Sequence, residues 1–472
     1  MKLIKIARRN LWRNKRRTAI TSASILFAVF FALIMRSFQL GFYDHMIKNA
    51  IESFSGFLQV QNIDYQDDPS LENTFIMNDS LLQLLENAEG VQAVVPRVES
   101  FALASSGNQT KGALIIGIDP EKETELSNPA NQIVHYRITK NILEELINED
   151  RIPAEIKEKL NLIANKSFTN TGTIAMELDL NEVKDKQILD IIGEISYYPG
   201  RYLTPDDEGV LVSDRLAKYL HINIGDTLIL FGQGYHGATA ADLYPVRGII
   251  TIANPELDNK LIYMNVASAQ YFLGFENRVT TLAINLVDNS NKNMLETQQK
   301  LNDLILDSTI VVKNWTEFNE VLAQQIESDN QSGQAFMALL YFIIFFGIIG
   351  TVLMMIHERK REFGVLVSIG MQKARLAIIL VLEMVFMGLI GVLSGTALSL
   401  PILWILHNNP IRLTGDMAQV MEDFGFEAVM PLAWIDMYVL WQGLVVALMV
   451  VLSCLFPLRK VFNMKAIDAL RA

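Results

Sequence analysis

Cysteine is almost absent from this sequence. Cys454 is the single cysteine among 472 residues, and it lies within an apolar run. A single thiol can form neither an intrachain disulfide nor a cysteine-based metal cluster, so the chain is not a disulfide-stapled secreted protein. The patterns GxxxxGK[ST], GxSxG and HExxH are also missing, and the six histidines are scattered with no pair at ligand spacing. No catalytic or metal-binding residue is therefore expected.

One glycine pattern imitates a cofactor site. Gly232-x-Gly234-x-x-Gly237 has the spacing of a dinucleotide fingerprint, and Asp258 follows about 20 residues later. The fingerprint requires a helix whose amino terminus meets the pyrophosphate, but here Tyr244-Pro245 soon begins another strand. The pattern is interpreted as the tip of a glycine-rich hairpin, and no cofactor is expected on this chain.

Long apolar runs are abundant. Half of the residues are hydrophobic and the mean hydropathy is +0.24. Four stretches reach the length of about 20 residues that a helix needs to cross a bilayer, at 19–40, 334–356, 376–400 and 435–456. The first stretch is too long for the apolar core of a signal peptide and has no clean cleavage site after it, which favours an uncleaved anchor.

Basic residues are concentrated beside these runs. Residues 1–17 hold eight cations and no acid, the 357–375 loop holds five cations and two acids, and the tail after Pro457 holds four cations and one acid. These pieces sum to +14, whereas the 41–333 segment sums to −22. Because cytoplasmic loops are rich in Lys and Arg, four spans with both termini inside satisfy the whole pattern.

The sequence thus predicts four transmembrane helices with a large mixed α/β extracytoplasmic domain of two lobes between spans 1 and 2. Strands at 56–62 and 93–105 flank a helix at 79–88, and strands at 279–288 and 308–314 flank a helix at 291–306. The predicted segments are a cytoplasmic amphipathic helix (1–17), span 1 (18–43), the outer domain (44–333, with an inserted strand-rich lobe at about 106–278), span 2 (334–356), a cytoplasmic loop (357–375), span 3 (376–400), an outer loop (401–434), span 4 (435–456) and a cytoplasmic tail (457–472).

Several residues within the spans are unusual. Glu383 lies inside span 3, where a carboxylate is costly. It either has a buried role or partner, or it snorkels or faces a polar group of a neighbouring helix, and both readings stay open. Gly388, Gly391 and Gly395 on the same span would let another helix approach closely. Arg36, at the end of span 1, is expected to reach the outer headgroups. Span 1 also presents a bulky surface for lipid or a lipidic substrate, formed by Phe27, Phe30, Phe31, Met35 and Phe38.

These residues carry a resemblance to a known family. "ARRNLWRNKRRTAITSASILFAV", "MMIHERKREFGVLVSIGMQKARL" and the ending "KAIDALRA" resemble the permeases of the MacB, LolC/LolE and FtsX superfamily, although Ala466 stands where proline is usual. "GVLVSDRLAKYLHINIGDTLIL" is similar to their periplasmic domain, and "IIGIDPEKE" is closer to the LolC/LolE branch. The likeness is weakest across 126–196.

The resemblance implies a MacB-like outer domain and a non-catalytic permease subunit of an ABC transporter in the bacterial inner membrane, with ATP and magnesium on a separate cytoplasmic ATPase. It implies that the loop after span 2 docks on that ATPase. The loop residues concerned are Glu358, Arg359, Lys360, Arg361, Glu362, Phe363, Gly364, Leu366, Ile369 and Gly370. Other expected partners are a second permease, membrane lipids, a lipoprotein substrate and a periplasmic chaperone. Nucleic acid is not expected.

Three alternatives remain. Within the superfamily, the chain could serve MacB-like efflux of a periplasmic substrate, or it could regulate cell-wall hydrolases as FtsX-like proteins do, although those have much smaller outer domains. Outside the superfamily, it could be a membrane-anchored receptor that needs no ATPase. The mixed charge of the 357–375 loop favours a partner surface, because acidic residues contribute little to topology.

Overall fold

The computed structural model describes residues 2–13, 15–413, 416–423 and 428–463, and it divides into two units. The first unit holds Met1–His45, Gln324–Leu413 and Val429–Ala472, and the second holds Met46–Ala323 and Thr414–Ala428. Each unit has its own buried core. The ending "KAIDALRA" (465–472), which contributes to the resemblance, lies outside the described residues.

Three helices are long and apolar enough to cross a membrane among the residues described: α2 (Lys15–Ile47), α13 (Glu320–Glu358) and α15 (Lys373–Asn408). At the position of the predicted fourth span, α17 (Met437–Ser453) has 17 residues and is therefore about 26 Å long, short of a hydrocarbon core of about 30 Å. After Cys454 the chain continues as α18 (Leu455–Phe462). The fourth span stays a prediction.

The amino-terminal helix α1 (Lys2–Arg13) has the predicted amphipathic pattern. Its apolar face packs within the first unit. Ala7 and Leu11 are buried, and α1 packs against α15. Arg8 and Arg9 are exposed on the opposite face.

The helix before span 2 is interrupted. α12 (Trp315–Phe318) ends at Asn319, whose φ and ψ of −120° and 57° are not helical. A capping box formed by Asn314 and Glu317 starts α12, and α13 then starts at Glu320. The two helices are separate because polar Asn319 adopts a non-helical backbone.

The second unit contains two interlocked split β-α-β units, built from the four strands and two helices that the sequence predicts. β1 (Leu58–Asn62), α3 (Asp79–Glu86) and β3 (Val91–Ser106) form one; β12 (Thr281–Leu286), α11 (Asn291–Leu304) and β13 (Ile310–Asn314) form the other. The strand order is β13-β1-β12-β3, and all neighbours are antiparallel. Each unit therefore has a strand of the other between its own two strands.

The same sheet continues into the strand-rich insertion and closes on itself there. β4 (Gln109–Ile118), β10 (Leu261–Asn265), β7 (Val210–Ser213), β9 (Thr239–Ile250) and β8 (Thr227–Gln233) follow β3 in order. β8 also pairs with the distal half of β3, from Ala102 to Ser105. This pairing completes a ring of strands that includes the β8–β9 hairpin with its tip at Gly232–Gly237. The division of the domain into two lobes stays a prediction.

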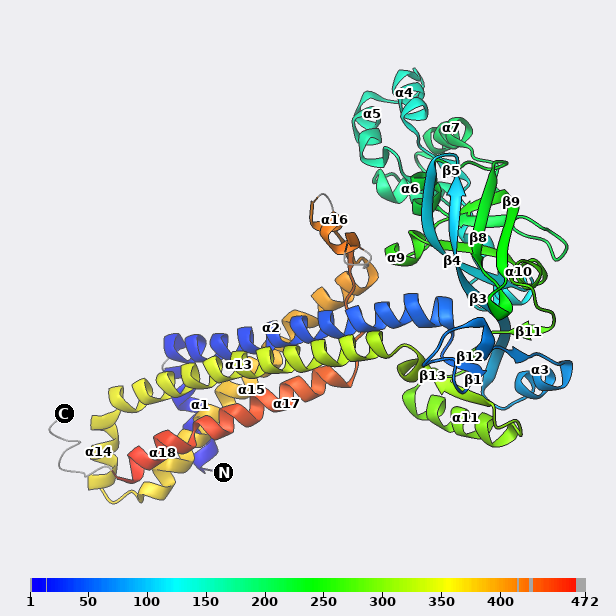
Figure 1. Cartoon of the computed structure of the whole chain (residues 1–472). Helices are drawn as coiled ribbons and strands as arrows, with labels where there is room; N and C mark the ends of the chain where they lie inside the picture. Colours follow the sequence, from blue (N-terminus) through cyan, green and yellow to red (C-terminus); the bar gives the residue numbers. More distant parts are fainter. Residues whose placement is uncertain (1, 14, 414–415, 424–427, 464–472) are drawn as a thin grey trace. The chain divides into compact units, whose positions relative to one another are not determined.

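Residues 126–196 form a mostly helical part with a core of its own. Its principal helices are α4 (Lys140–Asn148), α5 (Ala154–Leu160), α6 (Thr171–Glu177) and α7 (Lys186–Ser196), joined by the short pair β5 (Tyr136–Arg137) and β6 (Ser167–Phe168). Leu146, Leu160, Ile174 and Ile192 are fully buried between them. Figure 1 shows these helices clustered beside β5.

The remaining elements are short. In the second unit they include β2 (Phe75–Ile76), α8 (Asp214–Leu220), α9 (Pro255–Asp258), α10 (Val266–Leu273), β11 (Arg278–Val279) and α16 (Asp416–Asp423). In the first unit, α14 (Lys360–Ser368) follows α13, and β14 (Ile411–Arg412) pairs with β15 (Val429–Met430).

Candidate functional site

A buried carboxylate in the first unit accepts hydrogen bonds from two other segments of the chain. Glu383 on α15 is 1% exposed. Arg359, between α13 and α14, donates from Nη1 to both carboxylate oxygens of Glu383, at 3.1 and 2.9 Å. Asn10 on α1 donates from Nδ2 to Glu383 Oε1 at 2.6 Å. Glu383 therefore has buried partners, one of which is a polar group of the neighbouring helix α1.

The ion pair continues to the surface. Arg359 Nε donates to Glu362 Oε2 at 3.1 Å, and Arg13 Nη2 donates to both oxygens of Glu362 at 2.9 and 2.7 Å. The side chains of Arg13 and Glu362 are about half exposed. A chain of charge-assisted hydrogen bonds therefore runs Glu383–Arg359–Glu362–Arg13 and joins α15, α14 and α1. We refer to these four residues with Asn10 as the polar relay.

Not every residue predicted for the docking loop lies at the surface. Arg359, Phe363 and Gly364 are buried, Lys360 and Leu366 are half-buried, and Glu358, Arg361, Glu362, Ile369 and Gly370 are exposed. Arg359 and Phe363 are one helical repeat apart and turn inward together, with the guanidinium 5.1 Å from the ring centroid. Arg359, Phe363 and Gly364 thus face the interior of the first unit, and the docking of the loop on an ATPase stays a prediction.

The end of α14 depends on a glycine. Gly370 has φ of +103°, a conformation that side-chain-bearing residues rarely adopt, and its N–H donates to the Val367 carbonyl. Exposed Ile369 precedes it, and α15 begins at Lys373. Gly370 thus lets the chain reverse between the two helices.

The glycines of α15 lie where neighbouring helices come close. A Cβ at Gly391 would be 2.6 Å from Ile25 Cβ, and one at Gly395 would be 2.7 Å from the Leu26 carbonyl, both on α2. A Cβ at Gly388 would be 2.8 Å from a methyl group of Val450 on α17. Side chains larger than glycine would push these helices apart.

The aromatic surface of span 1 is only partly open. Phe27 and Phe31 are more than half exposed, whereas Phe30, Met35 and Phe38 are half-buried. Arg36, which is predicted to reach the outer headgroups, instead forms hydrogen bonds within the first unit. Its Nη1 donates to Gln39 Oε1 at 2.7 Å and to Asn330 Oδ1 on α13 at 3.1 Å, because α2 continues beyond the predicted end of the span.

Sequence reasoning missed Asn10. Asn10 is 9% exposed and lies three residues after Ala7 on the apolar face of α1. A lone amide among apolar residues at helical spacing is a usable signal, because a buried amide needs a hydrogen-bonding partner.

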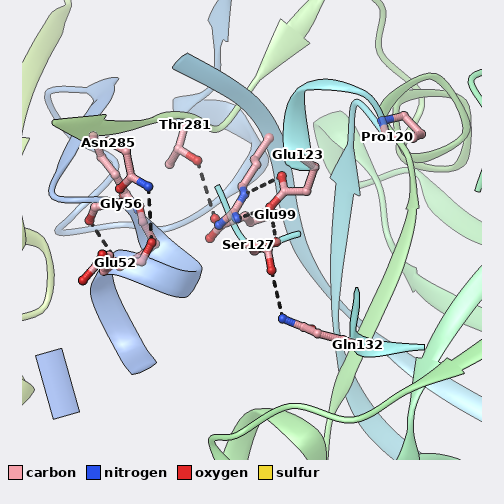
Figure 2. Close-up of polar contacts among 12 residues, drawn as sticks. Glu52, Gly56, Glu99, Pro120, Glu123, Ser127, Gln132, Thr281 and Asn285 are labelled. Atoms are coloured by element: carbon pink, nitrogen blue, oxygen red, sulfur yellow. Dashed lines mark hydrogen bonds and ion pairs between the residues drawn. The ribbon is translucent and has the colours of Figure 1, made fainter. Parts of the chain in front are cut away.

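The second unit contains another buried ion pair. Arg97 on β3 and Glu123 are both fully buried, with Nε and Nη2 donating to the carboxylate at 3.2 and 2.5 Å. Ser127 donates to Glu123 and accepts from Gln132, as Figure 2 shows. This network ends within the unit.

Comparisons with known proteins agree with this architecture. Residues 335–466, which contain α14 and α15, match the model of the FtsX-like permease C-terminal family. The lipoprotein-releasing system transmembrane protein LolC of Neisseria meningitidis serogroup B is 20% identical over 341 residues, which are 71% of this chain and 66% of that protein. LolC of Xylella fastidiosa is 20% identical over 280 residues, 57% of this chain and 66% of that protein. The matched region thus spans just under two thirds of these relatives.

Two solved structures are similar to this chain. The periplasmic region of MacB from Actinobacillus actinomycetemcomitans has 13% identity and a TM-score of 0.31. The superposed part covers 58% of this chain and 93% of the MacB region. The extracellular domain of YknZ from Gram-positive bacteria has 10% identity and a TM-score of 0.29, covering 55% of this chain and all of that one.

Proposed function

We propose, from the premise that this chain belongs to the MacB, LolC/LolE and FtsX superfamily of permeases, that it is the membrane subunit of a LolC/LolE-like ABC transporter. A separate cytoplasmic ATPase, which holds ATP and magnesium, would supply the motion. The chain would cross the inner membrane four times, with α17 and α18 together as the fourth span, both termini inside and the second unit in the periplasm. A second permease, identical or paralogous, completes the assembly.

The polar relay is the observation that carries this proposal. The loop between α13 and α15 is tied through Arg359 to Glu383, and through Glu362 to Arg13. A push on the exposed face of α14 would therefore reach α15 and α1 together rather than bend the loop alone. Packed elements with fixed polar links move as bodies, which is what transmission of ATPase motion requires.

Lipoproteins released from the membrane are the proposed cargo. The matching relatives named as lipoprotein-releasing proteins support this choice, and a periplasmic chaperone would receive the released lipoprotein. The partly exposed aromatic surface of span 1, at Phe27 and Phe31, would contact lipid or the acyl chains of the cargo.

A detergent pull-down tests the assignment of the ATPase partner. Arg361→Glu/Ile369→Asp alters two exposed residues of the loop, and Lys140→Glu/Val183→Asp makes the same chemical changes at exposed positions of the second unit. We expect an ATPase subunit to copurify with the wild type and the control, and to be lost from the loop variant. If no ATPase accompanies the wild type, or if the loop variant retains it, the proposal is wrong and a receptor without an ATPase becomes the better explanation.

A further inference from the structure

A cavity of about 760 Å³ lies within the second unit. Its walls come from the π-helix η1 (Lys48–Ser55), β1, the loop after β1, β3, the β8–β9 hairpin and α9. This volume is in the range of sites that hold small ligands or a few residues of a peptide. The wall includes apolar side chains, among them Phe54, Phe101 and Phe318, beside carboxamides and carboxylates.

The charged side chains of the cavity wall are all acidic. They are Glu72, Glu99 and Glu256, and Lys, Arg and His are missing from the wall residues described. Glu72 is paired with His236 Nδ1 at 3.0 Å, and Glu256 with Lys260 Nζ at 2.6 Å. These two carboxylates are therefore already occupied.

Glu99 differs from the other two carboxylates. Its side chain accepts one long hydrogen bond, from Thr281 Oγ1 at 3.5 Å, and it forms no ion pair among the residues described (Figure 2). Arg97, two residues earlier on β3, is engaged by Glu123 instead. Burial raises the pKa of Glu99, while the Arg97 charge opposes that rise. A carboxylate in this setting would be stabilised by a cation inside the cavity.

A buried donor in the same wall also lacks a partner. Gln61 on β1 is 1% exposed, and its Nε2 has no hydrogen-bond partner among the residues described. Buried amide donors are nearly always satisfied, because leaving one unpaired forfeits its hydration without compensation. Gln61 therefore calls for an acceptor oxygen, just as Glu99 calls for a cation.

We propose that this cavity binds a peptide segment carrying a lysine or arginine side chain. The cation would pair with Glu99, a peptide carbonyl would accept from Gln61 Nε2, and the aliphatic stem would lie along the apolar wall that includes Phe101. A peptide supplies both the cation and the acceptor, whereas a free polyamine supplies only the cation. The assignment comes from the cavity alone, so it goes beyond the proposed transport function and does not depend on an ATPase.

Titration calorimetry on the full chain in detergent tests the assignment. The probes are acetyl-Gly-Lys-Gly-amide, its neutral match acetyl-Gly-Gln-Gly-amide, and spermidine. We expect saturable binding of the lysine peptide at one site per chain, and weaker binding of the other two probes. Failure of the lysine peptide to saturate, or equal affinity for the glutamine peptide or spermidine, would overturn the proposal.

Three variants locate the site. Glu99→Gln keeps the shape of the side chain and should weaken lysine-peptide binding about tenfold or more, because the cation loses its counter-charge. Gln61→Leu should weaken it about threefold to tenfold, because a carbonyl contact is lost. Glu86→Gln is the matched control, since Glu86 is paired with Lys122 and is not part of the cavity wall, and it should stay within about twofold. An unchanged affinity in Glu99→Gln overturns the assignment, as would equal losses in Glu99→Gln and Glu86→Gln.

Discussion

Two buried arginine–glutamate pairs, one in each unit, are built from the same groups but connect to different surroundings. Arg97 and Glu123 are both fully buried, and their network continues to Ser127 and Gln132 within the second unit. Arg359 and Glu383 are 7% and 1% exposed, and their network continues through Glu362 to the surface.

This difference distinguishes a pair that stabilises one local segment from a pair that connects distant helices. Arg97 and Glu123 are 26 residues apart and fix one short segment against β3. The polar relay joins Asn10 to Glu383 across 373 residues, and it joins a helix junction to a membrane helix. A buried pair contributes little net stability against an apolar replacement, so the reason to keep the second pair is the connection that it makes.

Removing one partner of the buried Arg97–Glu123 pair should have the largest effect on stability. Arg97→Met leaves Glu123 buried without its cation, which is expected to cost about 3–5 kcal/mol of unfolding free energy. Denaturant unfolding followed by amide hydrogen exchange of the second unit measures this cost. Arg151→Met removes a cation from an exposed pair with Glu149 and should change the unfolding free energy far less. Equal losses in the two variants would show that Arg97 is not a structural centre.

The connecting pair should show strong non-additivity. Glu383→Met alone leaves Arg359 buried with only the half-exposed Glu362 as an anionic partner, with an expected loss of about 3 kcal/mol. The double variant Arg359→Met/Glu383→Met removes both charges and should lose less than either single variant, although the Asn10 amide then lacks its acceptor at a cost of about 1–3 kcal/mol. Thermal unfolding of the detergent-solubilised chain measures all three. A double-variant loss equal to the sum of the single losses would contradict the pairing.

Asp258, in the second unit, is a third buried carboxylate, and the charge of a second acid, Asp214, acts on it. Burial, and then the nearby charge of Asp214, raise the pKa of Asp258 to about 7. The folded chain therefore holds a proton that the unfolded chain loses near the ordinary carboxyl pKa. The stabilising contribution is fully present below that ordinary pKa and is lost as the pH rises to about 7.

Asp258→Asn tests this pH dependence. The amide cannot ionise, so the variant should show a smaller decline in stability between about pH 4 and pH 7 than the wild type. Unfolding midpoints of the second unit, measured by hydrogen exchange at several pH values, report the slope. Identical slopes in both proteins would contradict the raised pKa.

The exposed end of the polar relay should matter least for stability. Glu362→Gln weakens its contacts with Arg13 and Arg359, and because Glu362 is half exposed the loss is expected to be about 0.2–1 kcal/mol. Salt should screen most of this difference, which comparison of melting temperatures in low and high salt would detect. A salt-independent loss of several kcal/mol would place Glu362 in the buried part of the network.

Periodicity and length made most elements predictable. The apolar runs gave the three long helices, and alternation with turn residues gave β1, β3, β12 and β13 to within about two residues. Local pattern could not reveal that β3 pairs with both β4 and β8, because that ring depends on a 16-residue strand with different neighbours along its length.

The candidate site was predictable only in part. The cost of a carboxylate in an apolar span singled out Glu383. Its partners come from positions 24 and 373 residues away, which no local pattern connects. The inward orientation of Arg359 was not predictable for the same reason, since a charged residue in a charged loop gives no sign of a distant partner.

The central claim is that the pair Arg359–Glu383 transmits motion from the loop to the membrane helices. The direct test is hydrogen–deuterium exchange of the complex with its ATPase, with and without ATP and vanadate, in the wild type and in Arg359→Met/Glu383→Met. In the wild type we predict an ATP-dependent change in exchange along α1, from Lys2 to Arg13, which Asn10 joins to Glu383. The double variant should retain the ATPase and its hydrolysis but lose this change; a change of wild-type size would contradict the claim.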